Sequence, residues 1–209
     1  PPAFEFEPRD HVALGEALGV LDVERGVRTS GSRFVYLLGD IVQVQFALVR
    51  HALDILADRG FVPVIPPVLV REEAMFASGF LPTDEVNIYV TSPDELYLVG
   101  TSEVSLAAFH AGEILDEADL PIRYAGYSTC FRREAGTYGK DMGGMFRVHQ
   151  FDKVEMFSFC RPEDSWGEHE FMVGIEEEIL GNLELPYRVV NSAAGDLGGA
   201  AAKKYDLEV

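Results

Sequence analysis

The chain has 209 residues, of which 47% are hydrophobic and 25% charged, and its formal net charge is −18. This length supports one sizeable hydrophobic core with a small appendage, and no apolar run is long enough to predict a membrane-spanning segment. The acidic excess argues against general electrostatic binding of phosphate backbones. Any contact with RNA would therefore need a local basic surface or a segment outside this sequence.

The cysteines and the N-terminal residues favour a cytoplasmic protein. Cys130 and Cys160 form no Cys-x-x-Cys pair, so neither a disulfide framework nor a zinc knuckle is predicted. The chain does not begin with a basic stretch followed by an apolar one, so the sequence predicts no secretory signal. Two reduced thiols in the cytoplasm are the expectation.

The first third of the chain predicts helices followed by an extended segment. Residues 11–21 are consistent with a short helix, and residues 31–38 with a brief strand that leads into a second helix. Apolar residues recur at helical spacing from Gly39 to Arg59, and Gly60 stands at the expected stop. Residues 61–70 are apolar but contain prolines, which exclude a helix and predict a strand edge or an interface segment.

The rest of the chain predicts strands with helices between them. Strands are expected at residues 96–99, 123–134, 147–159 and 187–190, and helices at 103–115 and 164–183. Consecutive strands joined by loops, with helices inserted between groups, predict an α+β fold with an antiparallel sheet.

A glycine-rich segment, residues 135–146, lies between two of these strands. Long glycine-rich loops are more often functional than structural. Because side chains alternate along a strand, Arg132 and Glu134 should share one face of the first strand. In the second strand one face should carry Arg147, His149, Phe151, Lys153 and Glu155, and the other Val148, Gln150, Asp152, Val154 and Met156.

The charged face has two interpretations. It could be a solvated face with surface ion pairs, which contribute about 0–1 kcal/mol each. It could also be a ligand site, because guanidinium groups bind phosphate in a bidentate way, an aromatic ring stacks on a purine, and a carboxylate binds an ammonium group. The adjoining glycine loop favours the site. The sequence contains neither the phosphate-binding Gly-x-x-x-x-Gly-Lys-[Ser/Thr] loop nor a Gly-x-Gly-x-x-Gly motif after a strand.

Several segments, in this order, resemble the class II aminoacyl-tRNA synthetases, and the seryl branch in particular. Residues 129–136 (TCFRREAG), the glycine loop and residues 147–155 (RVHQFDKVE) resemble motif 2, which spans about residues 124–159. Residues 101–103 (TSE) are similar to the family's Thr-x-Glu element, and residues 31–70 resemble motif 1. Residues 1–209 would then be a partial catalytic domain of this class II fold.

The resemblance implies a role for each matching residue. Catalysis would depend on Arg132, Glu134 and Arg147. ATP would be bound by Arg132, Arg133, Glu134, Arg147, Val148 and Phe151. Serine would be bound by Thr101, Ser102, Glu103, Arg132 and Glu155. The family implies ATP with Mg²⁺ as cofactors, L-serine and tRNA(Ser) as partners, and a homodimer formed through motif 1.

Two parts of the family pattern are expected outside residues 1–209. The first is the N-terminal arm that binds tRNA. The second is motif 3, and the acid that would bind magnesium is expected with it, beyond Val209. The resemblance therefore assigns no metal ligand within this sequence.

Some single residues depart from the family pattern, and others have more than one possible role. Gly143 replaces an arginine that is frequent in the loop, and Ser105 replaces a common proline. Lys140 could contact the tRNA acceptor end or be simply solvated, and His149 is expected to be a hydrogen-bonded structural residue. The remaining histidines show no metal-ligand spacing and are expected in surface or packing roles: His11, His51, His110 and His169.

Two other functions stay open. One is an armless relative that charges an amino acid onto a carrier protein and uses zinc with cysteine ligands. The other is a non-catalytic domain of the same fold, kept for dimerisation or regulation.

Overall fold

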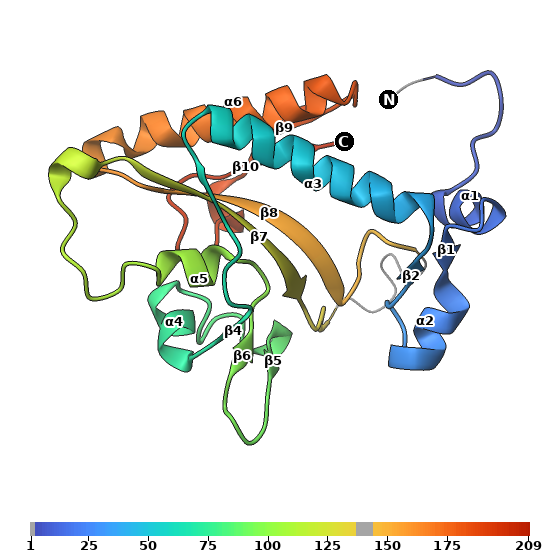
Figure 1. The fold of residues 1–209 in the computed structure, drawn as a ribbon, viewed down its shortest axis with the longest axis horizontal. Helices are drawn as coiled ribbons and strands as arrows, with labels where there is room; N and C mark the ends of the chain where they lie inside the picture. Colours follow the sequence, from blue (N-terminus) through green and yellow to red (C-terminus); the bar gives the residue numbers. More distant parts are fainter. Residues whose placement is uncertain (1–2, 137–143) are drawn as a thin grey trace.

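A long antiparallel hairpin forms the centre of the molecule (Figure 1). The computed structural model describes residues 3–136 and 144–209. In it, β7 (Ile122–Phe131) pairs with β8 (Gln150–Phe159) in a register that runs from Ile122↔Phe159 to Phe131↔Gln150. The short strand β3 (Val62–Val64) adds to β7 in parallel. The predicted α+β fold with an antiparallel sheet is confirmed, with this one parallel pair in addition.

Two long helices, α3 (Asp40–Asp58) and α6 (Ser165–Asn182), cover one face of the hairpin (Figure 1). Val154 and Met156 of β8 pack there against the buried Leu56 of α3 and Ile175 of α6. This is the apolar side of the predicted alternation. Lys153 and Glu155 are ion-paired with each other at 3.5 Å, as expected for residues of the opposite face. For residues 153–156 the alternation therefore predicts both faces correctly.

A second layer lies on the opposite face. It contains α4 (Glu72–Ala77), α5 (Glu103–Ala107) and a small sheet of β4 (Leu69–Val70), β6 (Tyr97–Leu98) and β5 (Tyr89–Val90). The predicted helix at 103–115 is wrong beyond Ala107, where the chain continues as turns. Gly112, with φ of 80°, occupies a left-handed conformation that ends helical structure.

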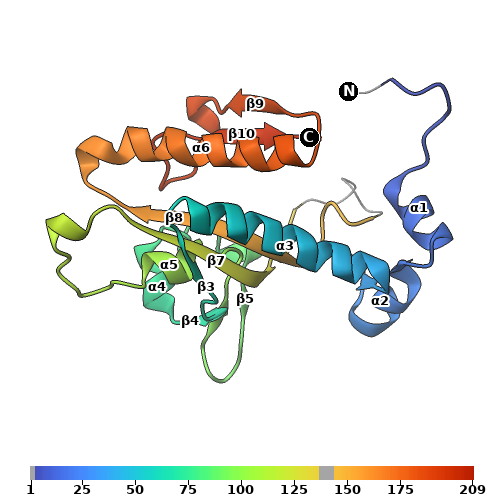
Figure 2. The same cartoon turned by 45° about the horizontal axis from the view of Figure 1, so that its top comes forward.

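The two ends of the chain form smaller units. The N-terminal unit, residues 10–38, contains α1 (His11–Ala17), β1 (Leu21–Asp22), α2 (Val23–Ser30) and β2 (Tyr36–Leu37). Asp10 and Asp22 cap its two helices by accepting backbone N–H bonds, each at 2.8 Å. At the other end, β9 (Arg188–Asn191) and β10 (Tyr205–Glu208) form a hairpin beside α6 (Figure 2). Short 3₁₀ turns lie at Glu85–Asn87, Glu117–Asp119, Pro162–Asp164 and Ala194–Asp196.

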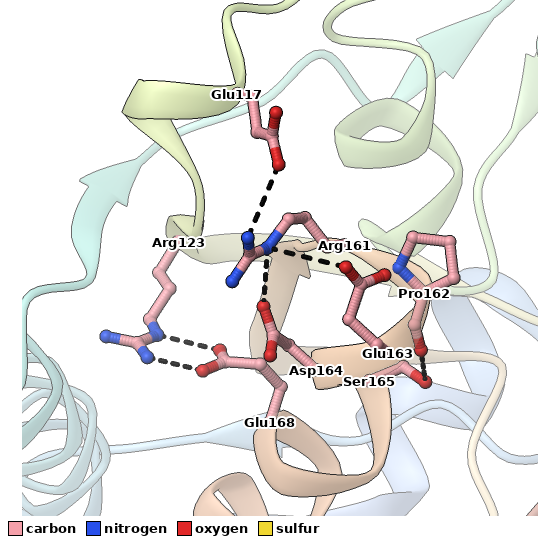
Figure 3. Close-up of polar contacts among 8 residues, drawn as sticks. All are labelled: Glu117, Arg123, Arg161, Pro162, Glu163, Asp164, Ser165 and Glu168. Atoms are coloured by element: carbon pink, nitrogen blue, oxygen red, sulfur yellow. Dashed lines mark hydrogen bonds and ion pairs between the residues drawn. The ribbon is translucent and has the colours of Figure 1, made fainter.

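Ion pairs fix the start of α6 against the sheet (Figure 3). Arg123 of β7 donates twice to the Glu168 carboxylate, at 2.8 and 2.5 Å. This bidentate bond is the main reason that the pKa of Glu168 is lowered. Arg161, just before the helix, pairs with Asp164 at 2.8 Å and with Glu117 at 3.3 Å. The start of the helix is thereby held at the end of the hairpin where Ile122 pairs with Phe159.

The end of the hairpin that carries the glycine-rich loop differs from the prediction. The strands expected at 123–134 and 147–159 stop at Phe131 and begin at Gln150, so Arg132, Glu134 and Arg147 lie beyond the ladder. Glu134 has φ of 49°, a left-handed conformation that turns the chain out of the strand. Helices α3 and α6 and strand β9 agree with the prediction to within two residues, whereas α2, α4, β5 and β10 have no counterpart in it. No helix within the described ranges is long and apolar enough to cross a bilayer.

Candidate active site

A cavity of about 690 Å³ opens at the end of the hairpin, on the face that carries α4 and α5. Four of the predicted site residues line it: Glu103, Arg132, Glu134 and Arg147. They come from α5 and from both stems of the glycine-rich loop. Its other walls include residues of α4, the 3₁₀ turn Glu85–Asn87, and the segment 196–204 that precedes β10.

The Arg132 side chain is held by a hydrogen bond from its Nε and by contact with an aromatic ring. Its Nε donates to the Gly100 carbonyl at 3.1 Å, and its guanidinium carbon lies 5.3 Å from the centre of the Phe151 ring. Its backbone N–H donates to the His149 carbonyl, so the two loop stems still touch beyond the ladder. Within the described residues, no acceptor forms a hydrogen bond with the terminal guanidinium nitrogens of Arg132. They are available to an anion in the cavity.

Glu134 and Arg147 join the two stems of the loop. Their carboxylate and guanidinium are 2.5 Å apart, with 13% of the Glu134 side chain and 36% of the Arg147 side chain exposed. The Arg147 Nε is buried and has no acceptor among the residues described. Left-handed backbone at a non-glycine residue such as Glu134 is uncommon and concentrates at functional sites.

A second group of polar side chains lies where α5 begins. Thr101 Oγ1 donates to Glu155 Oε2 at 2.5 Å and accepts the Glu103 backbone N–H at 3.2 Å. Burial, and then the nearby Glu155 charge, raise the pKa of Glu103, while Lys153 opposes them. Two carboxylates and one lysine leave an excess of negative charge, which suits an ammonium group.

The other predicted site residues are distributed differently. Ser102 is fully buried beneath the site, and its hydroxyl has no partner in the described part of the chain. The Arg133 side chain is exposed and does not line the cavity. Val148 and Phe151 line a separate cavity of about 750 Å³ on the α3 side. His149 is hydrogen-bonded as expected, through Nδ1 to the Arg132 carbonyl oxygen at 2.9 Å. Lys140 and Gly143 lie outside the described residues.

Sequence reasoning did not predict that Asn87 and Arg33 hold the loop stems. Asn87 accepts the Arg133 N–H with its carbonyl at 2.8 Å and the Ala135 N–H with its side-chain oxygen at 2.9 Å. Arg33 donates to the Glu134 carbonyl at 3.3 Å, and its own carbonyl accepts the His149 N–H at 3.2 Å. Arg33 has φ of 64°, but nothing in the sequence around either residue signals these contacts.

The arrangement can bind an anion and an ammonium group close together. Arginines at the loop stems suit phosphate, the Phe151 ring suits a flat base, and the carboxylates near Thr101 suit an amine.

The magnesium-binding acid is expected beyond Val209, so no metal ligand is predicted within this sequence. No cluster of three or more His, Cys, Asp or Glu side chains with metal-site geometry occurs in residues 3–136 and 144–209. Val209 itself is an exposed apolar residue that follows β10 and offers no side-chain ligand. The expected acid therefore stays a prediction about sequence outside residues 1–209.

Comparisons with known proteins identify similar chains. Residues 89–209 match the family model described as "tRNA synthetase class II core domain (G, H, P, S and T)". The chain is 57% identical to the serine–tRNA ligase of Acidothermus cellulolyticus over 208 residues, and 55% identical to that of Rhodococcus jostii over 207 residues. These matches cover 100% and 99% of this chain but 50% of each relative. The chain thus spans about half the length of the curated relatives it matches.

Solved structures agree with this likeness. A seryl-tRNA synthetase from Pyrococcus horikoshii complexed with ATP superposes with a TM-score of 0.95 at 52% identity, over 98% of this chain and 46% of the other. A cytoplasmic serine–tRNA ligase from Naegleria fowleri in complex with AMP gives a TM-score of 0.94 at 41% identity, over 99% and 48%.

Proposed function

The chain belongs to the family of class II tRNA synthetase core domains, and we propose that it is the catalytic core of a serine–tRNA ligase. In this proposal it joins L-serine to ATP as seryl-adenylate, and the whole protein transfers the seryl group to tRNA(Ser). The names of the relatives and their complexes with ATP and AMP support the proposal.

The observation that carries the proposal is the pairing of an anion subsite with an amine subsite. Arg132 presents guanidinium nitrogens that have no acceptor among the described residues, above Phe151. Glu103 and Glu155 concentrate negative charge beside Thr101. Serine activation needs both subsites, because the α-phosphate and the serine ammonium group must be held together. A polar pocket also discriminates against amino acids that lack the hydroxyl.

The residues present suit the chemistry of adenylate formation. A serine carboxylate oxygen attacks the α-phosphorus of ATP and forms a C–O–P bond, while the bond from the α-phosphorus to pyrophosphate breaks. Arg132 would stabilise the charge that builds on the α-phosphate oxygens. Arg147, held by Glu134, would bind the triphosphate tail. The attacking carboxylate is already ionised at neutral pH, so no base is required.

Mg²⁺ is proposed to arrive with ATP. The described residues contain no acidic cluster that fits the ion, and the resemblance to the family predicts the magnesium-binding acid outside residues 1–209. When bound, the ion would neutralise charge on the phosphates.

Homodimerisation through residues 31–70 is also part of the proposal. Helix α3 and the segment after it expose large apolar side chains, and 49% of Val44, 55% of Phe46 and 85% of Ile65 are exposed. Exposed apolar patches of this kind mark interaction surfaces. We infer a cytoplasmic location, as for other aminoacyl-tRNA synthetases.

The experiment that tests the function is serine-dependent ATP–pyrophosphate exchange by the full-length protein, with threonine, alanine and glycine as controls. Exchange with serine alone is the expected result. Exchange with another amino acid would overturn the serine assignment, and stoichiometric zinc would favour charging of a carrier protein. Absence of both exchange and ATP binding would favour the non-catalytic alternative.

A further inference from the structure

His11, at the start of α1, contacts the returning stem of the glycine-rich loop. Its Nε2 accepts the Met145 backbone N–H at 3.0 Å. Its ring also packs on the Phe146 ring, with centroids 4.3 Å apart. To accept this bond, Nε2 must be unprotonated and Nδ1 must carry the proton. The sequence predicted only a surface or packing role for this histidine, and these two contacts give it a specific partner.

The backbone of the loop is adapted to this contact. Gly144 has φ of 110°, and a Cβ there would lie 2.2 Å from His11 Nε2 and 3.3 Å from Val12 Cγ2. An L side chain would therefore both strain the backbone and displace the imidazole. Glycine at this position lets α1 approach the loop closely enough to hydrogen-bond it.

The contact lies next to a residue of the candidate active site. Met145 precedes Arg147 by two residues, and Arg147 lines the cavity and pairs with Glu134. The N-terminal unit also reaches both stems through Arg33, which contacts the Glu134 carbonyl and the His149 N–H. In Figure 1 the described return of the loop runs toward this unit.

We propose that His11 is a positioning residue, which fixes the Met145–Arg147 backbone from outside the cavity so that Arg147 is presented to the triphosphate of ATP. This inference rests on the proposed function, because Arg147 is taken to bind ATP. His11 itself does not line the cavity. Its loss should therefore weaken ATP binding without changing the amine subsite.

Matched substitutions in the full-length protein separate the parts of this contact. His11→Phe keeps a ring against Phe146 but removes the acceptor, and His11→Gln keeps an acceptor near Nε2 but removes the ring. Gly144→Ala disrupts the same contact by placing a Cβ against the His11 ring. Glu16→Ala, an exposed change on the same helix, is the control. The measurements are the KM values for ATP and serine in pyrophosphate exchange, and hydrogen exchange at the Met145 amide.

His11→Phe and Gly144→Ala should raise the KM for ATP by roughly 10-fold and leave the KM for serine unchanged. His11→Gln and Glu16→Ala should stay close to wild type. Protection of the Met145 amide should fall in His11→Phe and be restored in His11→Gln. An unchanged KM for ATP in His11→Phe, or equal rises in both KM values, would overturn the positioning role.

Failure of the proposed function gives a different pattern. A wild-type protein that exchanges no pyrophosphate with serine would refute serine activation, whereas the Met145 amide would still report on the His11 contact. Wild-type protection in His11→Phe would refute the contact itself, whatever the activity.

Discussion

Thr101 and Glu155, 54 residues apart in the chain, are joined by a 2.5 Å hydrogen bond from hydroxyl to carboxylate. Thr101 is 2% exposed and also accepts the Glu103 backbone N–H. One hydroxyl thus contacts the Glu155 carboxylate and the Glu103 backbone, which belong to the two acidic residues that would bind the serine amine.

Thr101→Val should raise the KM for serine by about 10-fold or more, because it removes this bond while keeping the shape of the side chain. Loss of a buried hydrogen bond to a charged group costs roughly 1–3 kcal/mol. Thr129→Val is the matched control, since Thr129 donates to the Asp152 carboxylate at 2.8 Å on the other face of the hairpin. It should lower the melting temperature without changing the KM for serine. A similar KM for serine in both variants would contradict the assignment.

The sequence predicts the hairpin and the two faces of β8 because alternation depends only on local geometry. Burial of Val154 and Met156 under α3 and α6 confirms this. The contacts of Asn87, Arg33 and His11 could not be predicted, because each joins the loop stems to a distant segment through backbone groups that any sequence carries.

Errors in the prediction have local causes. The helix predicted at 103–115 ends at Ala107, and Gly112 further along adopts a left-handed conformation. Ser102, which the resemblance to the Thr-x-Glu element assigns to serine binding, is fully buried at the N-terminal end of α5, and its role in serine binding stays a prediction.

Glu103→Gln should make the protein more stable at high pH but weaken serine binding. Burial and the Glu155 charge raise the pKa of Glu103 above its usual value of 4.5. As the pH rises above about 4.5, Glu103 loses its proton in the unfolded chain but still binds it in the folded state. The contribution of Glu103 to the free energy of unfolding therefore becomes less favourable as the pH rises through this range. Solvent screens this partly buried group, so we expect a gain in melting temperature of about 1–2 °C at pH 8 and none at pH 4.

Thermal denaturation of this variant, with the exposed Glu73→Gln as control, checks the pH dependence. Pyrophosphate exchange checks the function, where the KM for serine should rise because the ammonium group loses one charged partner. A melting temperature below wild type at pH 8 would refute the electrostatic argument.

Gly126→Ala should reduce both stability and serine activation. A Cβ at Gly126 would lie 2.9 Å from Leu106 Cδ1 and 3.0 Å from Ser102 Oγ, both on fully buried residues of the α5 region. Overpacking of this kind costs about 1–3 kcal/mol, and a shift of α5 would move Glu103. Gly174→Ala on α6, where a Cβ meets nothing within 4 Å, should instead stabilise by about 0.5–1 kcal/mol. Equal melting temperatures for the two variants would contradict this packing argument.

The Glu134–Arg147 pair should behave as one unit in a double-mutant cycle. Arg147→Met should raise the KM for ATP, because the triphosphate loses a cation. Glu134→Gln should raise it less, because Arg147 stays charged but loses the carboxylate that holds it. The double variant should be less impaired than the two single effects combined, with a coupling energy of about 0.5–3 kcal/mol.

The exposed pair Arg50–Asp54 on α3 is the control for this cycle, since its side chains are 77% and 54% exposed. Arg50→Met and Asp54→Asn should couple by no more than about 0.5 kcal/mol in stability and leave the KM for ATP unchanged. Raising the salt concentration should weaken this control pair more than Glu134–Arg147, because ions screen exposed charges most effectively. Strict additivity of the Glu134 and Arg147 effects would mean that the ion pair does not position the arginine for ATP.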